Sequence, residues 1–355
     1  MRIGILSYPM LFQRDVALQL QVRETTRALH CLAVQHGFEL SVELVDPSPR
    51  RLDQFDLIHV FSTGGGNHRI VEAAAALGVP VVLSPLISPG WDRACGEQAR
   101  QADHGLGKET AWTLHSSYAQ SRRALQLASV VVALGASEKK AIEEGFLIDS
   151  AKVRVFSNGV NERMFEADGD LFQLRTGMRG PFVLMDGPIS PYRNQLGMAR
   201  ALAGMGLPFV LLGEARERDQ DYLRQVRAIR GVTCLGGLKE DGPMLASADA
   251  AASVVVLPSR GDICTRTVFD ALAAGTPVVT SAASAIDVPG SAFALRQVAW
   301  DDPAAQHNAL LDLIAAPPER AAVRALVRAF TWERAAQQLA FCYLEQLASS
   351  SAIPA

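Results

Sequence analysis

Short apolar runs rich in β-branched residues alternate with stretches of helical spacing along most of the chain. The first run, residues 3–6, is followed by Leu18, Val22, Leu29 and Leu32 at helical spacing. Such alternation is typical of parallel sheets covered by helices on both faces. We therefore predict an α/β protein, with further strands of the first half at residues 38–44, 57–61, 79–83, 129–134 and 153–156.

A second series of the same kind begins after residues 161–180, which carry three glycines, mixed charges and no clear period. We interpret that stretch as a linker. The pattern predicts two Rossmann-like, doubly wound domains that face each other across a cleft, with ligands beyond the carboxyl ends of the strands. The strands expected in the second half are residues 182–185, 209–212, 232–235, 254–257 and 278–280.

Composition narrows the function classes. Of the 355 residues 49% are hydrophobic and 20% charged, which supports buried cores and argues against disorder. Lys plus Arg number 34 and Asp plus Glu 37, a formal net charge of −3, so the basic excess of a nucleic-acid binder is missing. The five cysteines are an odd number without a C-x-x-C pair, which favours reduced thiols.

Neither a membrane span nor a secretion signal is expected. The longest charge-poor stretch, residues 73–91, contains prolines and glycines that break a spanning helix. The apolar run at the N-terminus is shorter than a signal peptide requires. We predict a cytoplasmic protein and leave open a peripheral association with the inner face of the membrane.

The most informative stretch is residues 258–279, where a predicted strand ends in a loop and a helix starts near Thr265 and stops at Gly275. Backbone N–H groups at a helix start can bind an anion. Asp262 and Asp270 are eight residues apart, about two helical turns, so both carboxylates could meet one polyol ligand. The alternative is that both are ordinary solvated charges, with Asp262 near the helix dipole.

This stretch resembles the donor-site signature of retaining, family 4 glycosyltransferases of the GT-B fold, also called glycosyl transferases group 1. Their pattern has Pro-Ser, two residues, Glu-Gly-Phe-Gly, a second Glu eight residues after the first, and a final Gly-x-Pro-Val-Val. The present chain aligns without a gap, with Asp262 and Asp270 in place of the two glutamates. The resemblance implies that Asp262 holds the sugar, Asp270 the ribose, and the backbone of Ile263, Cys264 and Thr265 the sugar and phosphate.

Other segments resemble the family in order and spacing. Residues 157–165 are similar to its Asn-Gly-Val-Asp joint, and residues 190–195 to the segment whose Lys contacts the donor diphosphate, with Arg193 at the Lys position. Residues 235–238 resemble the loop beside the nucleobase, bordered by Leu238 and Lys239. Residues 330–332 resemble the start of a C-terminal helix that returns to the N-terminal domain.

The resemblance implies a metal-independent, retaining enzyme that moves a sugar from a nucleotide sugar, UDP- or GDP-linked, to a glycan, lipid-linked or small-molecule acceptor. No other cofactor is expected, and the oligomeric state stays open. The implied domains are an acceptor domain at 1–165, a donor domain at 175–330 and a C-terminal helix at 331–350. Asp262 and Arg193 are the implied catalytic residues, and donor binding involves Arg193, Asn194, Gly213, Leu238, Lys239, Asp262, Ile263, Cys264, Thr265, Thr267 and Asp270.

Three departures from the family pattern motivate other hypotheses. Pro188 stands where the family has a second cation, the glycine pair after the first strand is missing, and no His lies near Leu86. A catalytically silent GT-B protein that binds a nucleotide sugar or a partner enzyme is one alternative, and a nucleotide-sugar epimerase is another. A dinucleotide-dependent oxidoreductase is disfavoured because no glycine fingerprint follows either domain's first strand.

Acceptor contacts are expected in the N-terminal domain. A glycine triplet follows one strand and opens a helix, but it matches no phosphate-loop motif, so a tight turn is the alternative. The irregular region after residue 83 could supply further contacts or be a surface loop. His59, inside a strand, is expected to be a buried, hydrogen-bonded residue, and no metal site is expected. The acceptor-side candidates are Gly64, Gly65, Gly66, Trp91, Arg93 and His104.

Overall fold

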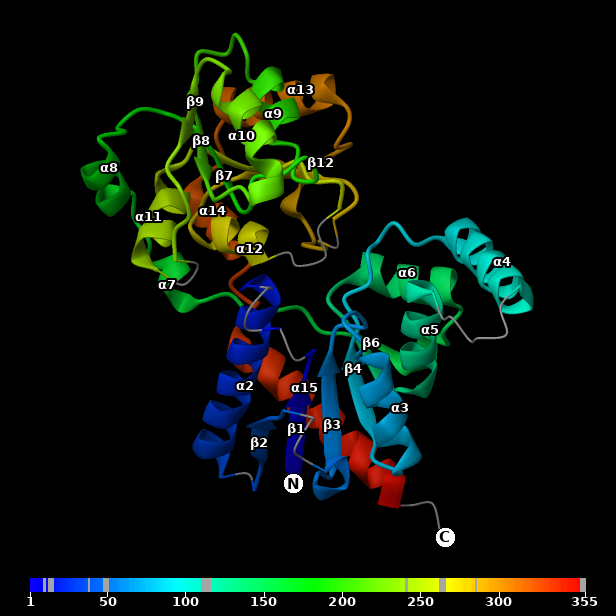
Figure 1. Cartoon of the computed structure of the whole chain (residues 1–355). Helices are drawn as coiled ribbons and strands as arrows, with labels where there is room; N and C mark the ends of the chain where they lie inside the picture. Colours follow the sequence, from blue (N-terminus) through cyan, green and yellow to red (C-terminus); the bar gives the residue numbers. More distant parts are fainter. Residues whose placement is uncertain are drawn as a thin grey trace. The chain divides into compact units, whose positions relative to one another are not determined.

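The computed structural model describes residues 1–8, 11, 16–37, 39–46, 51–109, 116–239, 242–261, 266–284 and 286–351. It divides into two compact units, which are described separately below (Figure 1). Unit 1 comprises Met1–Gly159, Ala285–Asp287 and Phe330–Ala355. Unit 2 comprises Val160–Ser284 and Val288–Ala329.

Unit 1 is built on a six-stranded, fully parallel sheet in the order β2-β1-β3-β4-β5-β6. The central strands are continuous apolar runs because both of their faces are covered. The chain changes direction between β1 and β3, which is the switch point of this sheet. The strands are β1 (Arg2–Leu6), β2 (Ser41–Leu44), β3 (Leu57–Phe61), β4 (Val81–Ser84), β5 (Val130–Ala133) and β6 (Val153–Val155).

One face of this sheet is covered by α2 (Val16–His36) and α15 (Trp332–Ser351), which pack against each other (Figure 1). The imidazole of His59 is fully buried there and bonds Tyr343 Oη of α15 at 2.7 Å and Ser84 Oγ at 2.9 Å. The expectation of a buried, hydrogen-bonded His59 is confirmed, and so is the return of the C-terminal helix to the first domain.

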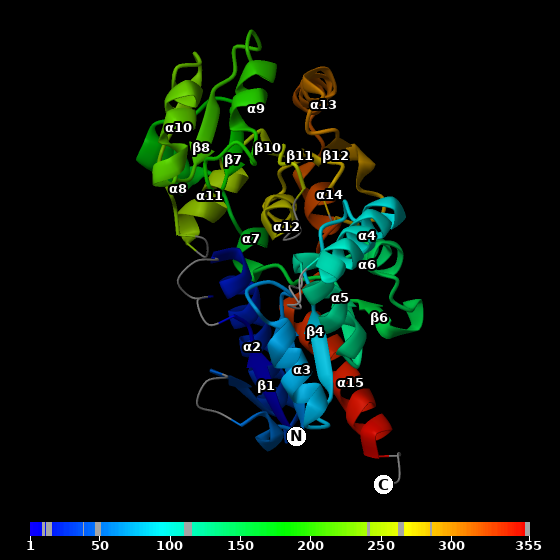
Figure 2. The same ribbon diagram turned by 45° about the vertical axis from the view of Figure 1, so that its right-hand side comes forward.

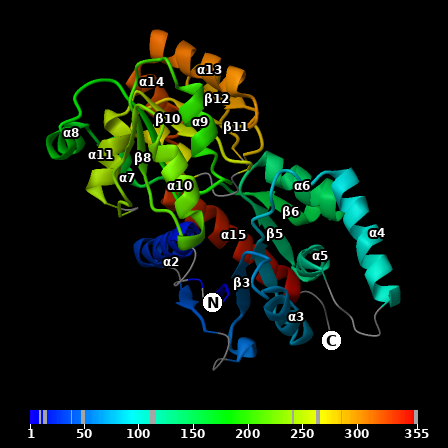
Figure 3. The same ribbon diagram turned by 45° about the horizontal axis from the view of Figure 1, so that its top comes forward.

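The other face of the unit 1 sheet carries a second hydrophobic cluster. Helices α3 and α5 pack side by side there, and α4 packs on α6 (Figure 3). Their bounds are α3 (His68–Ala76), α4 (Arg93–Glu109), α5 (Ser117–Leu127) and α6 (Ala136–Phe146).

Unit 2 repeats the plan with the strand order β12-β11-β10-β7-β8-β9, again all parallel. The chain builds β7, β8 and β9 outward in one direction and then returns to the other side of β7 with β10. The switch point therefore lies between β7 and β10. The strands are β7 (Val183–Asp186), β8 (Phe209–Leu212), β9 (Val232–Cys234), β10 (Val254–Leu257), β11 (Val278–Ser281) and β12 (Leu295–Val298).

Helices cover both faces of this second sheet. In the view of Figure 2, α9 (Gln195–Ala201) and α13 (Pro303–Ala315) lie above the strands, and α12 (Arg266–Ala273) and α14 (Arg320–Ala325) lie below them. Helix α10 (Gln220–Arg227) contacts α9, and α11 (Pro243–Ala251) contacts α12. The α/β class and the doubly wound sheets expected from the sequence are confirmed.

Three local expectations differ from the structure. The region after residue 83, expected to be irregular, contains helix α4, which carries Arg93 and His104, because its contacts with α6 order it as a helix. The stretch interpreted as a linker contains two short helices, α7 (Glu162–Phe165) and α8 (Asp170–Thr176). Helix α8 is held because Phe172 is fully buried and its N–H donates to Ser247 Oγ of α11 at 2.9 Å. One turn or two of helix are too short to show a period, so tertiary packing decides their formation. Strand β12 was not predicted, since its polar residues Arg296 and Gln297 interrupt the apolar run.

Candidate functional site

The switch point of unit 2 places two of the predicted motifs together. Strands β7 and β10 are adjacent and parallel, with Val183 opposite Val254 and Leu184 opposite Val255. Their carboxyl ends therefore meet at one edge of the sheet, which is where open α/β sheets bind ligands. The loop of residues 187–194 leaves β7 at this edge, and residues 258–261 leave β10 beside it.

The backbone at the ends of β7 and β8 is closely packed. Gly213 has φ +157°, and a Cβ there would lie 1.9 Å from the carbonyl oxygen of Gly187, so the position excludes any side chain. Gly187 N–H donates to Leu212 O at 2.8 Å, and Ile189 N–H donates to Glu214 O at 2.9 Å. Gly213, predicted as a donor-site residue, thus lets the two loops run side by side.

Arg193 lies over the end of β7. Its guanidinium Cζ is 3.7 Å from the position that a Cβ of Gly187 would occupy, so the absent side chain makes room for it. The Arg193 N–H closes a turn on Ser190 O at 3.0 Å. Gln195 braces the same turn, because its amide donates to Pro188 O at 3.0 Å and accepts from Ser190 N–H at 3.3 Å. The half-buried cation is therefore held by a fixed backbone.

Hydrogen bonds join this loop directly to the loop after β10. The Tyr192 hydroxyl donates to Gly261 O, and Arg260 N–H donates to Tyr192 O at 3.2 Å. Asn194, a predicted donor-site residue, starts α9 with a left-handed φ of +61° and donates to Trp300 O at 2.8 Å. The Arg260 guanidinium stacks 4.6 Å from the Trp300 ring centroid. The segment that carries Arg193 and the one that leads to Asp262 thus form one structure.

Helix α12 follows this loop and carries the second predicted carboxylate. Asp270 is 5% exposed, and its Oδ2 accepts from Arg266 Nη1 at 2.7 Å, one helical turn away. Asp249 on α11 is buried, and its Oδ1 has no hydrogen-bond partner among the described residues. Burial, together with the charges of Asp186 and Asp270, raises the pKa of its carboxyl well above the usual range. In the part of the chain that the structure describes, these carboxylates do not form a metal-binding group.

Of the remaining donor-side candidates, three lie among the described residues and four do not. Leu238 is half-buried and Lys239 exposed, in the loop that follows β9, and Thr267 is half-buried in the first turn of α12. All three therefore leave side-chain surface for a ligand. The predicted residues Asp262, Ile263, Cys264 and Thr265 lie outside the described residues.

The acceptor-side candidates of unit 1 differ from one another in burial and in local structure. The glycine triplet makes a tight turn between β3 and α3: Gly65 has φ +64°, and a Cβ there would lie 2.6 Å from Tyr8 Cβ. Trp91 is half-buried and packs against Tyr118 and Phe146, with ring centroids 5.3 and 5.2 Å away. Arg93 is exposed, Gly64 and Gly66 are exposed, and the side chain of His104 lies outside the described residues.

Sequence reasoning missed three residues of the unit 2 site. Tyr192 was read only as part of a motif, although its hydroxyl joins the two loops. Asp186 and Asp249 were not singled out, and they share an electrostatic environment with Asp270. Asp186 ends a buried strand, a signal that could have identified it. Asp249 sits in an apolar helix and had no signal before its burial was known.

Comparison with known proteins is consistent with this geometry. Residues 197–316 match the family described as glycosyl transferases group 1. The chain is 28% identical over 242 residues to glycogen synthase of Mycobacterium tuberculosis, an alignment that covers 60% of this chain and 53% of that protein. The chain therefore spans about half the length of the curated relatives it matches.

Solved structures share the fold over almost the whole chain. HepE of Anabaena in complex with UDP has a TM-score of 0.69 at 20% identity, covering 98% of this chain and 100% of that one. Sucrose-phosphate synthase of Thermosynechococcus elongatus has a TM-score of 0.70 at 16% identity, with the same coverage. WaaG, a glycosyltransferase involved in lipopolysaccharide biosynthesis, has a TM-score of 0.61 at 16% identity, covering 95% and 99%.

The fold is therefore that of the GT-B glycosyltransferases, as the motifs predicted. Residues 197–316, which match the glycosyl transferases group 1, form much of unit 2. Within the described ranges, no helix combines the length and apolar character needed to cross a bilayer.

Proposed function

We propose that the chain is a nucleotide-sugar glycosyltransferase whose donor site lies at the switch point of unit 2. The observation that carries this proposal is the joined pair of loops after β7 and β10, which holds the Arg193 guanidinium over Gly187. A guanidinium suits the two negatively charged phosphates of a nucleotide sugar because its N–H groups match their oxygens.

In the proposed reaction the bond between the sugar C1 and the diphosphate oxygen breaks, and a bond from C1 to an acceptor hydroxyl oxygen forms. The acceptor proton leaves with the nucleoside diphosphate or to solvent. Negative charge grows on the departing diphosphate, and Arg193 stabilises it without a metal. Asp262 binds the sugar hydroxyls and Asp270 the ribose, as the resemblance implies. Retention of configuration rests on the resemblance alone.

The nature of the donor is supported by one of the structural relatives. HepE has been solved in complex with UDP-glucose, and that structure has a TM-score of 0.68 to this chain at 18% identity. A UDP-linked hexose is accordingly the first donor to test, with a GDP-linked hexose as the second. A glycan or lipid-linked molecule is the proposed acceptor, with turnover at the inner face of the membrane or in the cytoplasm.

The test is a panel of UDP-, GDP-, ADP- and TDP-linked hexoses, with donor binding measured by calorimetry and turnover by release of the nucleotide. We expect one donor class to bind and turn over, and Arg193→Ala to weaken its binding at least about tenfold. Arg227→Ala is the matched control, because it removes an exposed cation at the end of α10, outside the two loops. Equal donor binding by the wild-type chain and Arg193→Ala contradicts the proposed site.

A catalytically silent donor-binding protein is the second candidate. Pro188 favours it, since this position has no side-chain cation and its carbonyl is used by Gln195. A tight nucleotide complex without hydrolysis, transfer or epimerisation across the panel would support this alternative. Alteration of the donor sugar in the absence of an acceptor would instead indicate an epimerase.

A further inference from the structure

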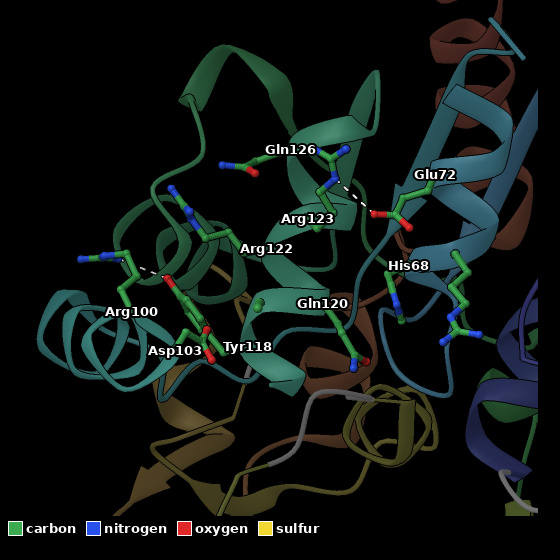
Figure 4. Close-up of a pocket in the computed structure, with 11 residues that line it drawn as sticks. His68, Glu72, Arg100, Asp103, Tyr118, Gln120, Arg122, Arg123 and Gln126 are labelled. Atoms are coloured by element: carbon green, nitrogen blue, oxygen red, sulfur yellow. Dashed lines mark hydrogen bonds and ion pairs between the residues drawn. The ribbon is translucent and has the colours of Figure 1, made fainter. Parts of the chain in front are cut away.

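A groove in unit 1 lies between α3, α4 and α5 and has no part in the donor site (Figure 4). Its volume is about 900 Å³, which is large enough for a disaccharide-sized molecule. Four arginines line it against two carboxylates, and the polar side chains Gln120 and Gln126 complete the wall. The lining arginines are Arg69, Arg100, Arg122 and Arg123, and the carboxylates are Glu72 and Asp103.

The charge of this groove is unevenly compensated. Arg123 Nε pairs with Glu72 Oε1 at 3.2 Å on the α3 side, and this pair neutralises itself. Among the described residues, no carboxylate lies within ion-pair distance of Arg100 or Arg122. The side of the groove formed by α4 and α5, where Arg100 and Arg122 lie with Asp103, therefore carries a net positive charge.

Arg100 and Arg122 are held in place by neutral groups. Arg100 Nη1 donates to Tyr118 Oη at 3.2 Å and to Gly145 O at 3.4 Å, and Arg122 Nε donates to Phe146 O at 3.3 Å. Gly145 and Phe146 are consecutive residues at the end of α6, so the two guanidiniums are anchored one residue apart. Figure 4 shows both side chains on the same side of the groove.

The anchor itself is rigid. The Tyr118 hydroxyl donates to Gly145 O at 2.8 Å, and its ring is 4% exposed and stacks on Phe146 with centroids 4.8 Å apart. Each guanidinium uses one N–H group to cap a carbonyl at the C-terminus of α6. A guanidinium has five N–H donors, so several on Arg100 and Arg122 stay available for a ligand.

We propose that this groove binds a phosphate group and that Arg100 and Arg122 are its main ligands. A phosphate has three or four acceptor oxygens and matches two guanidiniums anchored on neighbouring carbonyls better than a neutral sugar does. The role of the groove as the site for a phosphorylated acceptor rests on the proposed glycosyltransferase function. Its ability to bind phosphate does not. The shared chemistry is a phosphate carried either by a soluble sugar or by a lipid headgroup.

The experiment uses the full chain with Arg193→Gln, so that the donor site contributes no phosphate binding. Calorimetry with glucose 6-phosphate and co-sedimentation with phosphatidylglycerol vesicles are compared. We expect at least one probe to bind, and the added pair Arg100→Gln with Arg122→Gln to weaken that binding at least about tenfold. The pair Arg27→Gln with Arg154→Gln removes the same charge from exposed positions of unit 1 and should weaken it less than about twofold.

A second variant protects the test against misfolding of the double variant. Asp103→Asn removes a carboxylate from the groove and should tighten binding about two- to threefold, a gain that an unfolded protein cannot give. Binding of glucose 6-phosphate assigns the phosphate to a soluble sugar, and binding to vesicles alone assigns it to a lipid. Absence of binding to both probes, or equal losses in the groove pair and the control pair, overturns the proposal. UDP binding by the chain with intact Arg193 reports separately on the donor site.

Discussion

The Tyr192 hydroxyl donates a hydrogen bond to the carbonyl oxygen of Gly261 across the switch point of the second sheet. Tyr192 precedes Arg193 in the loop after β7, and Gly261 lies in the loop after β10, so this contact joins the two loops at the proposed donor site. Tyr192 is 50% exposed, and its main chain contacts the same loop through the hydrogen bond from Arg260 N–H to Tyr192 O.

Replacement Tyr192→Phe should weaken binding of the nucleotide donor. The loss of one hydrogen bond of about 1 kcal/mol corresponds to roughly a fivefold rise in Kd. Calorimetric titration with the donor identified by the panel measures it. Tyr343→Phe, which loses a hydroxyl in unit 1, is the matched control and should keep the wild-type Kd. An unchanged Kd in Tyr192→Phe would show that the bond does not position the site.

Gly213→Ala should destabilise unit 2 and abolish donor binding. The added Cβ would lie 1.9 Å from Gly187 O at a φ of +157°, so the ends of β7 and β8 must separate. We expect a loss of about 3 kcal/mol or more in the free energy of unfolding, from strain and clash together. Chemical denaturation measures the loss. Gly180→Ala, where a Cβ meets open space, should change the stability by less than about 1 kcal/mol.

The ion pair between Arg266 and Asp270 gives a third prediction. Both side chains are mostly buried, 13% and 8% exposed. Removing only the cation, in Arg266→Met, leaves a buried carboxylate and should cost about 3 kcal/mol of unfolding free energy. The double variant Arg266→Met with Asp270→Leu should recover most of that loss. A double variant whose loss equals the sum of the single losses would show that the pair is not coupled.

How far the sequence predicts this fold depends on the length of each pattern. The strands ending at Leu6, Phe61 and Leu257 lie in apolar runs typical of a sheet covered on both faces. The sequence predicted all three. Helices α7 and α8 and strand β12 depend on tertiary partners such as Ser247 Oγ, which no local pattern contains. Single-sequence periodicity therefore recovers the sheets and misses the short elements around them.

The candidate site shows the same division. The placement of Arg193 after β7 and of Gly213 after β8 could be predicted from the order of strands in a parallel sheet, and their donor-site roles stay predictions. The ion pair of Asp270 with Arg266 and the buried carboxyl of Asp249 could not be, because they depend on how α11 and α12 pack on the sheet. The groove bounded by Arg100 and Arg122 was also missed, since its residues come from separate helices without a shared motif.

The stability of unit 1 should depend on pH through His59. Burial lowers the pKa of its imidazole from 6.5 to about 3, so the folded protein keeps it neutral while the unfolded chain takes up a proton below pH 6.5. The contribution is fully present above pH 6.5 and is lost progressively as the pH falls toward about 3. Denaturant unfolding from pH 7.5 to 4.5 measures the slope.

The variant His59→Gln provides the comparison for this pH dependence. It removes the titrating group and should be less stable than the wild-type chain at pH 7.5, because Tyr343 and Ser84 lose their buried partner. Its stability should fall less steeply between pH 6.5 and 4.5. Equal slopes for the two proteins in that window would assign the pH dependence to other groups.

The most direct measurement is a crystal structure of the chain with UDP bound. We predict that the diphosphate lies within hydrogen-bond distance of the Arg193 guanidinium, beside the loop that Tyr192 and Gly261 hold together, with the ribose hydroxyls at Asp270. A nucleotide bound elsewhere, with Arg193 and Asp270 out of reach of it, would contradict the donor site described here.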